Sequence, residues 1–238
     1  MDKKTRCIVL RTVKVSDNRI IADLLCRECG RLSVALPVGR RSTSRSLFQP
    51  LTVLEIDYTV SQRQQLARIK DARIAMTYVS LPFDGTKLSL AFFVAEFLSF
   101  CTRDLHSDPN LYDFVEQNLL WLDVTDSGMA NFHLMFMIRM ARFLGFYPDT
   151  TSYSPGAFFD MREGVFCQYA PCHGDFLKQD DAERMMLLMR MKPGNMHLFH
   201  MTRADRNRIT DFCLHFYRLH IPSFGEMKTL EVLRSVGS

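Results

Sequence analysis

Two cysteines, Cys26 and Cys29, are separated by two residues, a spacing that serves thiol redox chemistry or a zinc ion. Redox pairs of this kind begin a helix, where the helix dipole lowers the thiol pKa. Here the pair lies at the end of an expected strand and in its turn, so we expect no catalytic thiol. Zinc would need two further ligands, for which Cys167, Cys172 and His173 are the candidates. Adjacent Cys172 and His173 cannot easily reach one ion, so we expect no metal and no cofactor.

The common catalytic motifs are missing from the chain. No G-x-x-x-x-G-K-[ST], G-x-G-x-x-G, G-x-S-x-G or H-E-x-x-H occurs. The histidine pairs His197/His200 and His215/His220 have no carboxylate at a matching spacing, so we expect them to be solvated or part of the core. The sequence therefore predicts a protein that is not an enzyme.

Six basic residues of the N-terminal third have the charge to follow a phosphate backbone: Arg11, Lys14, Arg40, Arg41, Arg45 and Arg68. The three arginines in the middle of this set lie on the polar, Ser-rich segment 39–48, which we expect to be an exposed loop. Single-strand binders also stack bases on aromatic rings, and the nearest rings here are Phe48 and Tyr58. Binding would then depend mainly on charge and be weakly sequence-specific.

The charge is unevenly distributed along the chain. The whole sequence has 30 Lys and Arg against 26 Asp and Glu, for a net charge of +4. Residues 1–80 hold 15 basic against 7 acidic residues, whereas residues 81–238 hold 15 against 19. This asymmetry indicates a polyanionic partner for the first segment and a different partner for the second, with a merely solvated basic surface as the alternative.

Alternating apolar and polar residues predict five strands near the N-terminus, at residues 6–14, 19–27, 31–38, 49–60 and 65–76. Short polar turns at 16–18 and 28–30 join the first three, and Gly30 can adopt a positive φ there. Five short strands within about 75 residues fit a small closed barrel of the OB-fold type better than a sandwich, which needs about seven. We therefore expect a barrel domain at residues 1–80.

The pattern becomes helical after residue 81, and we expect an α-helical domain over residues 81–238. Helices are predicted at 86–104, 108–122, 127–144, 179–191, 202–220 and 225–236. Prolines and glycines between them predict an irregular insertion at about 146–178, with a hairpin that pairs 158–159 with 165–166. The fold class is thus α+β with two domains.

Two features bear on the compartment. The most apolar stretch, 88–100, contains Glu96 and is shorter than the roughly 20 residues that span a membrane, so we expect no membrane partner. Seven irregularly spaced cysteines with no preceding signal peptide indicate reduced thiols and a cytoplasmic protein.

Three collinear stretches make the chain resemble the RecO family of DNA repair mediators. They are CIVLRTVKVSDNRIIADLLCRECGRLSVALPVGRR with SRSLFQPLTVLEIDY, then SLPFDGTKLSLAFFVAEFL, and finally FYRLHIPSFGEMKTLEVL near the C-terminus. The resemblance implies an OB-fold that binds single- and double-stranded DNA, strand annealing, and cooperation with RecR in loading RecA onto DNA coated by single-stranded-DNA-binding protein. Many relatives place four cysteines in the insertion as a zinc site, whereas 150–154 here contains no cysteine. We therefore expect a zinc-finger-like insertion that is free of zinc and is held by Phe158, Phe159, Val165 and Phe166.

The resemblance also implies that the helical domain receives the acidic C-terminal tail of single-stranded-DNA-binding protein. Arg139 and Arg142, beside Phe136 and Phe143, are the candidates for that contact, unless they merely solvate their helix. Two other classes remain as alternatives: an adaptor whose barrel contacts protein rather than DNA, and a nucleic-acid enzyme with an unrecognised site.

Overall fold

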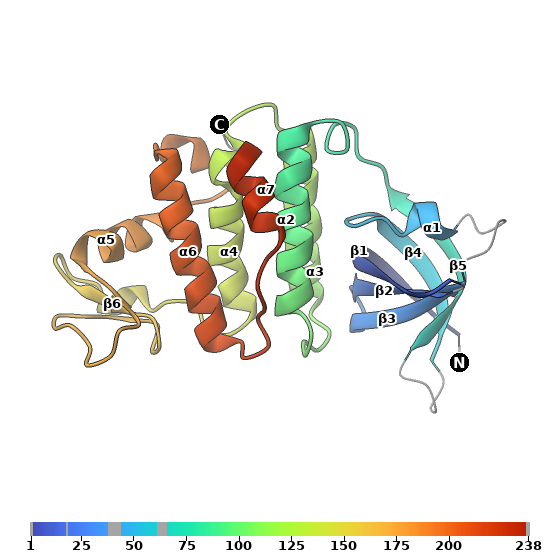
Figure 1. Ribbon diagram of the computed structural model, residues 1–238, viewed down its shortest axis with the longest axis horizontal. Helices are drawn as coiled ribbons and strands as arrows, with labels where there is room; N and C mark the ends of the chain where they lie inside the picture. Colours follow the sequence, from blue (N-terminus) through green and yellow to red (C-terminus); the bar gives the residue numbers. More distant parts are fainter. Residues whose placement is uncertain (1, 18, 38–43, 61–65, 237–238) are drawn as a thin grey trace. The chain divides into compact units, whose positions relative to one another are not determined.

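The computed structural model describes residues 2–17, 19–37, 44–60 and 66–236 (Figure 1). The chain folds as two compact units. Unit 1 comprises Met1–Val124 and Met227–Val236, and unit 2 comprises Thr125–Glu226 and Gly237–Ser238. Residues 227–236 therefore return to the unit in which the chain begins. No helix of the described residues is long and apolar enough to cross a membrane.

Unit 1 begins with a closed barrel of five strands, which confirms the predicted OB-type fold (Figure 1). The strands are β1 (Asp2–Ser16), β2 (Arg19–Cys26), β3 (Gly30–Pro37), β4 (Val53–Thr59) and β5 (Ala67–Met76). Their order around the barrel is β1-β2-β3-β5-β4, and β1 closes it by pairing with β4. The β3–β5 contact is parallel, as Val34↔Ala67 and Ala35↔Arg68, and the other pairs are antiparallel.

The barrel interior is filled by alternate residues of each strand, because successive side chains point to opposite faces of a sheet. Cys7, Ala22, Val34 and Leu54 are among these fully buried side chains. Segment 39–48 was expected to be an exposed loop, and this is wrong for its second half. Ser44–Leu47 forms the short helix α1, and Phe48 is 1% exposed within the barrel core. A large aromatic ring at that point gains more from filling the barrel than from contact with water.

Helices complete unit 1. α2 (Gly85–Cys101) is capped by Asp84, whose side chain accepts hydrogen bonds from Thr86 N and Lys87 N. It is buried on most of its surface, as its all-round apolar sequence predicts, and packs against β1, α3 (Pro109–Val124) and α7 (Thr229–Val236). The Glu96 carboxylate of α2 accepts hydrogen bonds from Lys228 N at 3.0 Å and Thr229 N at 2.8 Å, and so fixes the start of α7.

Unit 2 contains α4 (Phe132–Phe143), α5 (Gln179–Leu188) and α6 (Arg203–His220). Short 3-10 turns lie at Met129–Asn131, Thr150–Ser152 and Met196–Leu198. The expected insertion between α4 and α5 forms a small sheet of β6 (Phe158–Asp160), β7 (Val165–Cys167) and β8 (Phe176–Leu177), in the order β7-β6-β8. The predicted hairpin is confirmed, with Phe159 paired with Phe166.

Aromatic packing and ion pairs hold the insertion. The ring of Phe159 lies 4.9 Å from that of Phe166 and 5.8 Å from that of Phe216 on α6. The sequence offers His215 no carboxylate at a matching spacing, and its partner comes from another segment: its Nε2 lies 2.9 Å from Asp175 in the insertion. Hydrogen bonds from His215, and then from Arg162, hold the pKa of Asp175 below its usual value. These contacts join residues far apart in sequence, so spacing along one helix could not predict them.

Candidate nucleic-acid interface

One outer side of the barrel is covered. Ile8, Leu10, Leu25 and Val53 are each at most 1% exposed although they are not part of the core inside the barrel. β1 packs against α2 on this side, and two ion pairs join the barrel to α3: Arg6–Glu116 at 2.7 Å and Arg27–Asp113 at 2.8 Å. The covered side is not available to a nucleic acid, so an interface must lie elsewhere on the barrel.

Further along the same strands, past this covered part, the outer surface is formed by the end of β1, the start of β2, the end of β3 and the start of β5. Strand register aligns Val13 with Ile21, Ile21 with Ala35, and Ala35 with Arg68 across it. Residues paired in this way point to the same face of a sheet. We call this surface the open barrel face and define it by Arg11, Val13, Arg19, Ile21, Ala35 and Arg68.

Arg11 lies on the open barrel face and shares a carboxylate with another arginine. Its Nε donates to Asp23 Oδ2 at 2.6 Å, and Arg31 reaches the same oxygen at 2.9 Å. Burial alone would raise the pKa of Asp23, but hydrogen bonds from Ser33 and Arg11 outweigh it and hold the pKa below its usual value. Two guanidinium groups against one carboxylate leave a positive charge beside Val13, whose side chain is 45% exposed.

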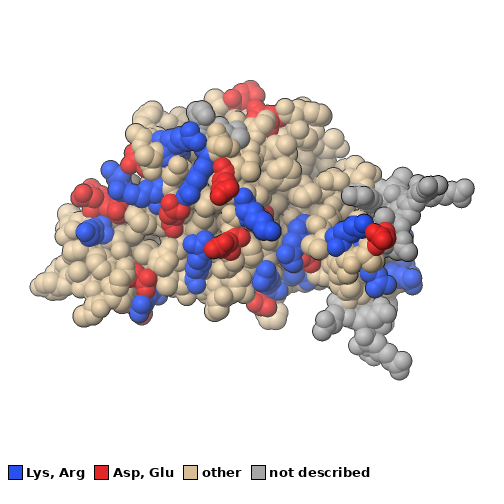
Figure 2. All heavy atoms as spheres, viewed as in Figure 1, with Lys and Arg blue, Asp and Glu red and all other residues tan. Residues whose placement is uncertain are grey.

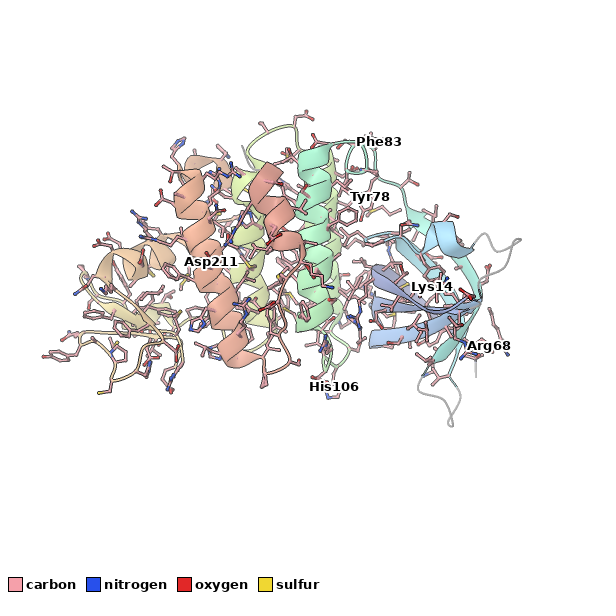
Figure 3. The ribbon with its side chains drawn as sticks, viewed as in Figure 1. Lys14, Arg68, Tyr78, Phe83, His106 and Asp211 are labelled. Atoms are coloured by element: carbon pink, nitrogen blue, oxygen red, sulfur yellow. The ribbon has the colours of Figure 1, made fainter. Side chains whose placement is uncertain are left out.

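Lys14 and Arg68 lie at the same end of the barrel (Figure 3). Lys14 points to the opposite side of β1 from Arg11 and Val13, because strand side chains alternate, and its Nζ pairs with Asp17 at 2.8 Å. Arg68 is exposed and has no carboxylate partner among the described residues. Three strand spacings separate β1 from β5, which places Val13, the residue in register with Arg68, roughly 14 Å from it along the sheet. Arg11 lies two residues further along β1. Of the basic residues predicted from sequence, Arg11 and Arg68 therefore share the open barrel face, whereas Lys14 points away from it.

Arg40 and Arg41 lie outside the described residues, and Arg45 is described only as part of the α1 backbone. Their position along the chain is still informative, because the segment that carries Arg40 follows Pro37, the last residue of β3. Pro37 pairs with Arg19 at the start of β2. Arg19 is exposed, has no carboxylate partner among the residues that the structure describes, and was missed by the sequence analysis. Its place directly after the 16–18 turn was the available signal.

The β4–β5 side of the barrel is electrically balanced. Lys4 pairs with Asp57 at 3.3 Å, Lys70 with Asp2 at 2.7 Å, and Arg73 with Glu55 at 2.5 Å. Each of these three cations has its own carboxylate, so a phosphate would have to displace it. This side therefore offers matched control positions rather than a candidate interface.

The expected stacking rings are not available. Phe48 is 1% and Tyr58 3% exposed, and both belong to the barrel core, so neither can stack on a base. Tyr58 alternates with the outward residues Asp57 and Thr59 on β4, and this places its ring inside. The apolar surface that is exposed instead comes from Val13 and Val15, at 45% and 57%. A strand bound here would rest on aliphatic side chains and arginines.

The cysteine pair is part of the barrel wall. Cys26 pairs with Cys7 in the β1–β2 register, and both are fully buried. Contact with the Cys26 thiol, and then burial, raises the pKa of Cys29 far above its usual value, which disfavours the reactive thiolate. Within the described residues, no three His, Cys, Asp or Glu side chains gather in a way that would hold a metal ion.

Arg139 and Arg142 lie on α4 of unit 2, and their side chains have different surroundings. Arg139 Nε donates to the Met191 carbonyl at 2.9 Å, whereas the Arg142 guanidinium lies 4.2 Å from the centre of the Tyr147 ring. Phe136 is completely buried, so it cannot line a surface pocket.

A pocket of about 310 Å³ lies instead between α5 and α6, with Leu187 and Phe199 in its wall.

Comparison with known proteins identifies related chains over the full length. Residues 1–78 match the family model Recombination protein O N terminal, and residues 82–229 match Recombination protein O C terminal. The chain is 42% identical to the DNA repair protein RecO of Phocaeicola vulgatus over 241 residues, which cover 100% of both chains. It is 37% identical to that of Bacteroides fragilis, over 99% of each chain, and 35% identical to that of Porphyromonas gingivalis, over 98% of each.

Proposed function

The chain belongs to the RecO family of DNA repair proteins, and on this premise we propose that it is a non-enzymatic recombination mediator that binds single-stranded DNA through the open barrel face. In this proposal it binds duplex DNA more weakly, anneals complementary strands, and acts with RecR to load RecA onto DNA coated by single-stranded-DNA-binding protein. Its compartment is the cytoplasm.

The observation that carries the proposal is the charge of the open barrel face. Arg19 and Arg68 have no carboxylate partners among the described residues, and Arg11 shares one carboxylate with Arg31. Such uncompensated cations gain most from a phosphate, because binding releases the counterions held by the nucleic acid. The proposed interface also includes the arginines that come after β3 in the chain, which are Arg40, Arg41 and Arg45. Lys14 lies at its edge.

The test is a titration of a fluorescent oligo-dT with the full chain at several salt concentrations. Each lost phosphate contact on a single strand changes the log–log slope by about 0.7. Arg19→Gln with Arg68→Gln should therefore flatten the slope by roughly 1.4, and Arg40→Ala with Arg41→Ala and Arg45→Ala by roughly 2.1. The matched control, Lys70→Gln with Arg73→Gln, removes two cations that already have carboxylate partners and should leave the slope nearly unchanged.

The same titration distinguishes a DNA-binding protein from the alternative, a protein-interaction adaptor. A protein adaptor that uses the barrel to contact another protein would show weak DNA binding without salt dependence in every variant. An equal slope in wild type and in both barrel variants would contradict DNA binding by the open barrel face.

We also propose that Arg139 and Arg142 receive the acidic C-terminal tail of single-stranded-DNA-binding protein. The exposed guanidinium of Arg142 and the partly buried one of Arg139 provide a local positive potential for such a tail. Two ion pairs of about 0.7 kcal/mol each predict roughly tenfold weaker peptide binding for the Arg139→Ala, Arg142→Ala chain. Calorimetry with a synthetic tail peptide measures this, and undiminished affinity would move the peptide site away from α4.

A further inference from the structure

A second strongly basic segment lies in unit 2. Residues 184–208 contain six Lys and Arg residues and a single acidic residue, Asp205. The mildly acidic balance of residues 81–238 conceals this local excess. The segment runs from the second half of α5 to the start of α6, and Figure 2 shows Lys and Arg atoms gathered where α5 leads into α6.

Two acidic residues of this region, Asp205 and Asp181, already have partners. Asp205 accepts hydrogen bonds from the Thr202 hydroxyl and from Arg184, both at 2.7 Å, and Asp181 pairs with Arg208. Arg190 and Lys192 are exposed and have no carboxylate partner within the described part of the chain. Their positive charge is therefore uncompensated.

Arg206, one of the six cations of this segment, and Arg139 on α4 each have a backbone carbonyl as their hydrogen-bond partner rather than a carboxylate. Arg206 donates to the Met201 carbonyl at 2.8 Å, and Arg139 donates to the Met191 carbonyl at 2.9 Å, between Arg190 and Lys192 in the sequence. Burial, and then repulsion from Arg142, lowers the pKa of Arg139. The positive potential here thus comes from several elements at once, and a carbonyl partner does not cancel it.

A pocket lies between α5 and α6, and Met201 in its wall accepts the hydrogen bond from Arg206. Its volume is about 310 Å³, and its wall is mostly apolar, with Leu187, Phe199, Met201 and Ile209 among the lining residues. The polar lining is His200 and the ion pair of Arg184 with Asp205. This is at the lower end of the range of roughly 300–1,000 Å³ found for small-ligand sites. Leu187 is 46% exposed although it is apolar, so the pocket leaves hydrophobic surface open to water.

We propose that this α5–α6 surface, defined by Arg190, Lys192, Arg206 and the pocket, is a second binding surface for single-stranded nucleic acid. Phosphates lie along the three cations, and one unstacked base enters the pocket against Phe199 and His200. Single-strand binders combine this kind of cationic track with rings that stack on bases. The surface belongs to unit 2 and the open barrel face to unit 1, so one chain would offer two binding surfaces for a strand.

The experiment uses the full chain and an oligo-dT that carries 5-iododeoxyuridine for photocrosslinking. Arg190→Gln with Lys192→Gln should flatten the salt dependence of binding by roughly 1.4 in the log–log slope. The control, Lys178→Gln with Arg218→Gln, removes two exposed cations from the same unit outside the segment and should leave the slope unchanged. Crosslinks should appear within residues 187–201 as well as on the barrel.

A second variant tests the pocket itself. His200 is exposed, so His200→Ala should not disturb the fold. This change should weaken oligonucleotide binding several-fold, because a ring that stacks on the base is lost.

The outcomes separate this inference from the proposed function. A slope equal to that of the control, or crosslinks confined to the barrel, would overturn the second surface and leave the barrel proposal standing. The second surface would also be overturned if Arg190→Gln with Lys192→Gln lost binding of the synthetic acidic tail peptide and kept oligonucleotide binding unchanged. A reduced slope for Arg190→Gln with Lys192→Gln, together with an unchanged one for Arg19→Gln with Arg68→Gln, would support this surface and count against the open barrel face.

Discussion

Asp123 fixes the segment that joins the barrel to α2. Its carboxylate, 3% exposed at the end of α3, accepts hydrogen bonds from Val79 N at 2.8 Å, Ser80 N at 2.8 Å and Leu81 N at 2.7 Å. The buried Lys87 donates to the Asp123 backbone carbonyl at 2.8 Å. Burial alone would raise the pKa of Asp123, but the three backbone hydrogen bonds outweigh it and lower the pKa.

Replacing Asp123 by Asn should therefore destabilise the fold. The amide offers one acceptor oxygen to three donors and has no charge, so we expect a loss of about 2–3 kcal/mol in the free energy of unfolding. The loss should depend on pH with a definite sign. A lowered folded-state pKa means that Asp123 stabilises the fold above the ordinary value of 3.8 and loses this effect as the pH falls through the folded-state value. Urea titrations of both proteins at pH 7 and pH 3 measure it, and a difference that grows in acid would contradict this account.

The β2–β3 turn shows how an element depends on a neighbouring segment. Gly30 has a φ of +71°, and a Cβ built there would lie 2.9 Å from the backbone of both Leu105 and His106. The turn thus packs directly against the loop between α2 and α3, where Figure 3 labels His106. Only glycine fits both the backbone conformation and the close approach.

Gly30→Ala should consequently cost about 1–3 kcal/mol from the backbone conformation alone, and more from the clash. Gly85→Ala is the matched control, because nothing lies within 4 Å of a Cβ built at this first residue of α2. Alanine is the better helix former, so the control should be neutral or up to about 1 kcal/mol more stable. Thermal unfolding measures the melting temperatures of both variants. Equal values would contradict the predicted destabilisation and show that the loop at Leu105 and His106 shifts to accept the added methyl group.

The elements were predictable from sequence where the pattern is local. The five strands and the turn at Gly30 follow from alternation and a glycine, and α2 follows from a long apolar run. The helix α1 was not predictable, because four residues rich in serine give no periodic signal. The direction of Phe48 was also missed, because a basic loop sequence does not show which side chain turns inward. Partners of Arg11 and His215 come from other elements, so spacing within one segment could not reveal them.

At the scale of the whole molecule, unit 1 is larger than the barrel, because it also contains α2, α3 and α7. The chain passes through unit 2 and returns, and α7 packs against α2, which itself packs against β1. The predicted division at residue 80 would cut through this packing. It would expose Ile8, Leu10, Leu25 and Val53, which are at most 1% exposed in the full chain. Burial of each such side chain is worth roughly 1.5–3 kcal/mol.

The division at residue 80 can be tested with two shortened chains. A domain of about 80 residues rarely gains more than about 3–5 kcal/mol from its core, which is less than the burial that residues 1–80 alone would lose. We therefore expect residues 1–80 to unfold at much lower urea than residues 1–124 joined by a Gly-Ser linker to 227–236, which keep the cover. Circular dichroism of both chains against urea compares the midpoints. Similar midpoints would show that the barrel folds independently and that α2, α3 and α7 do not stabilise it.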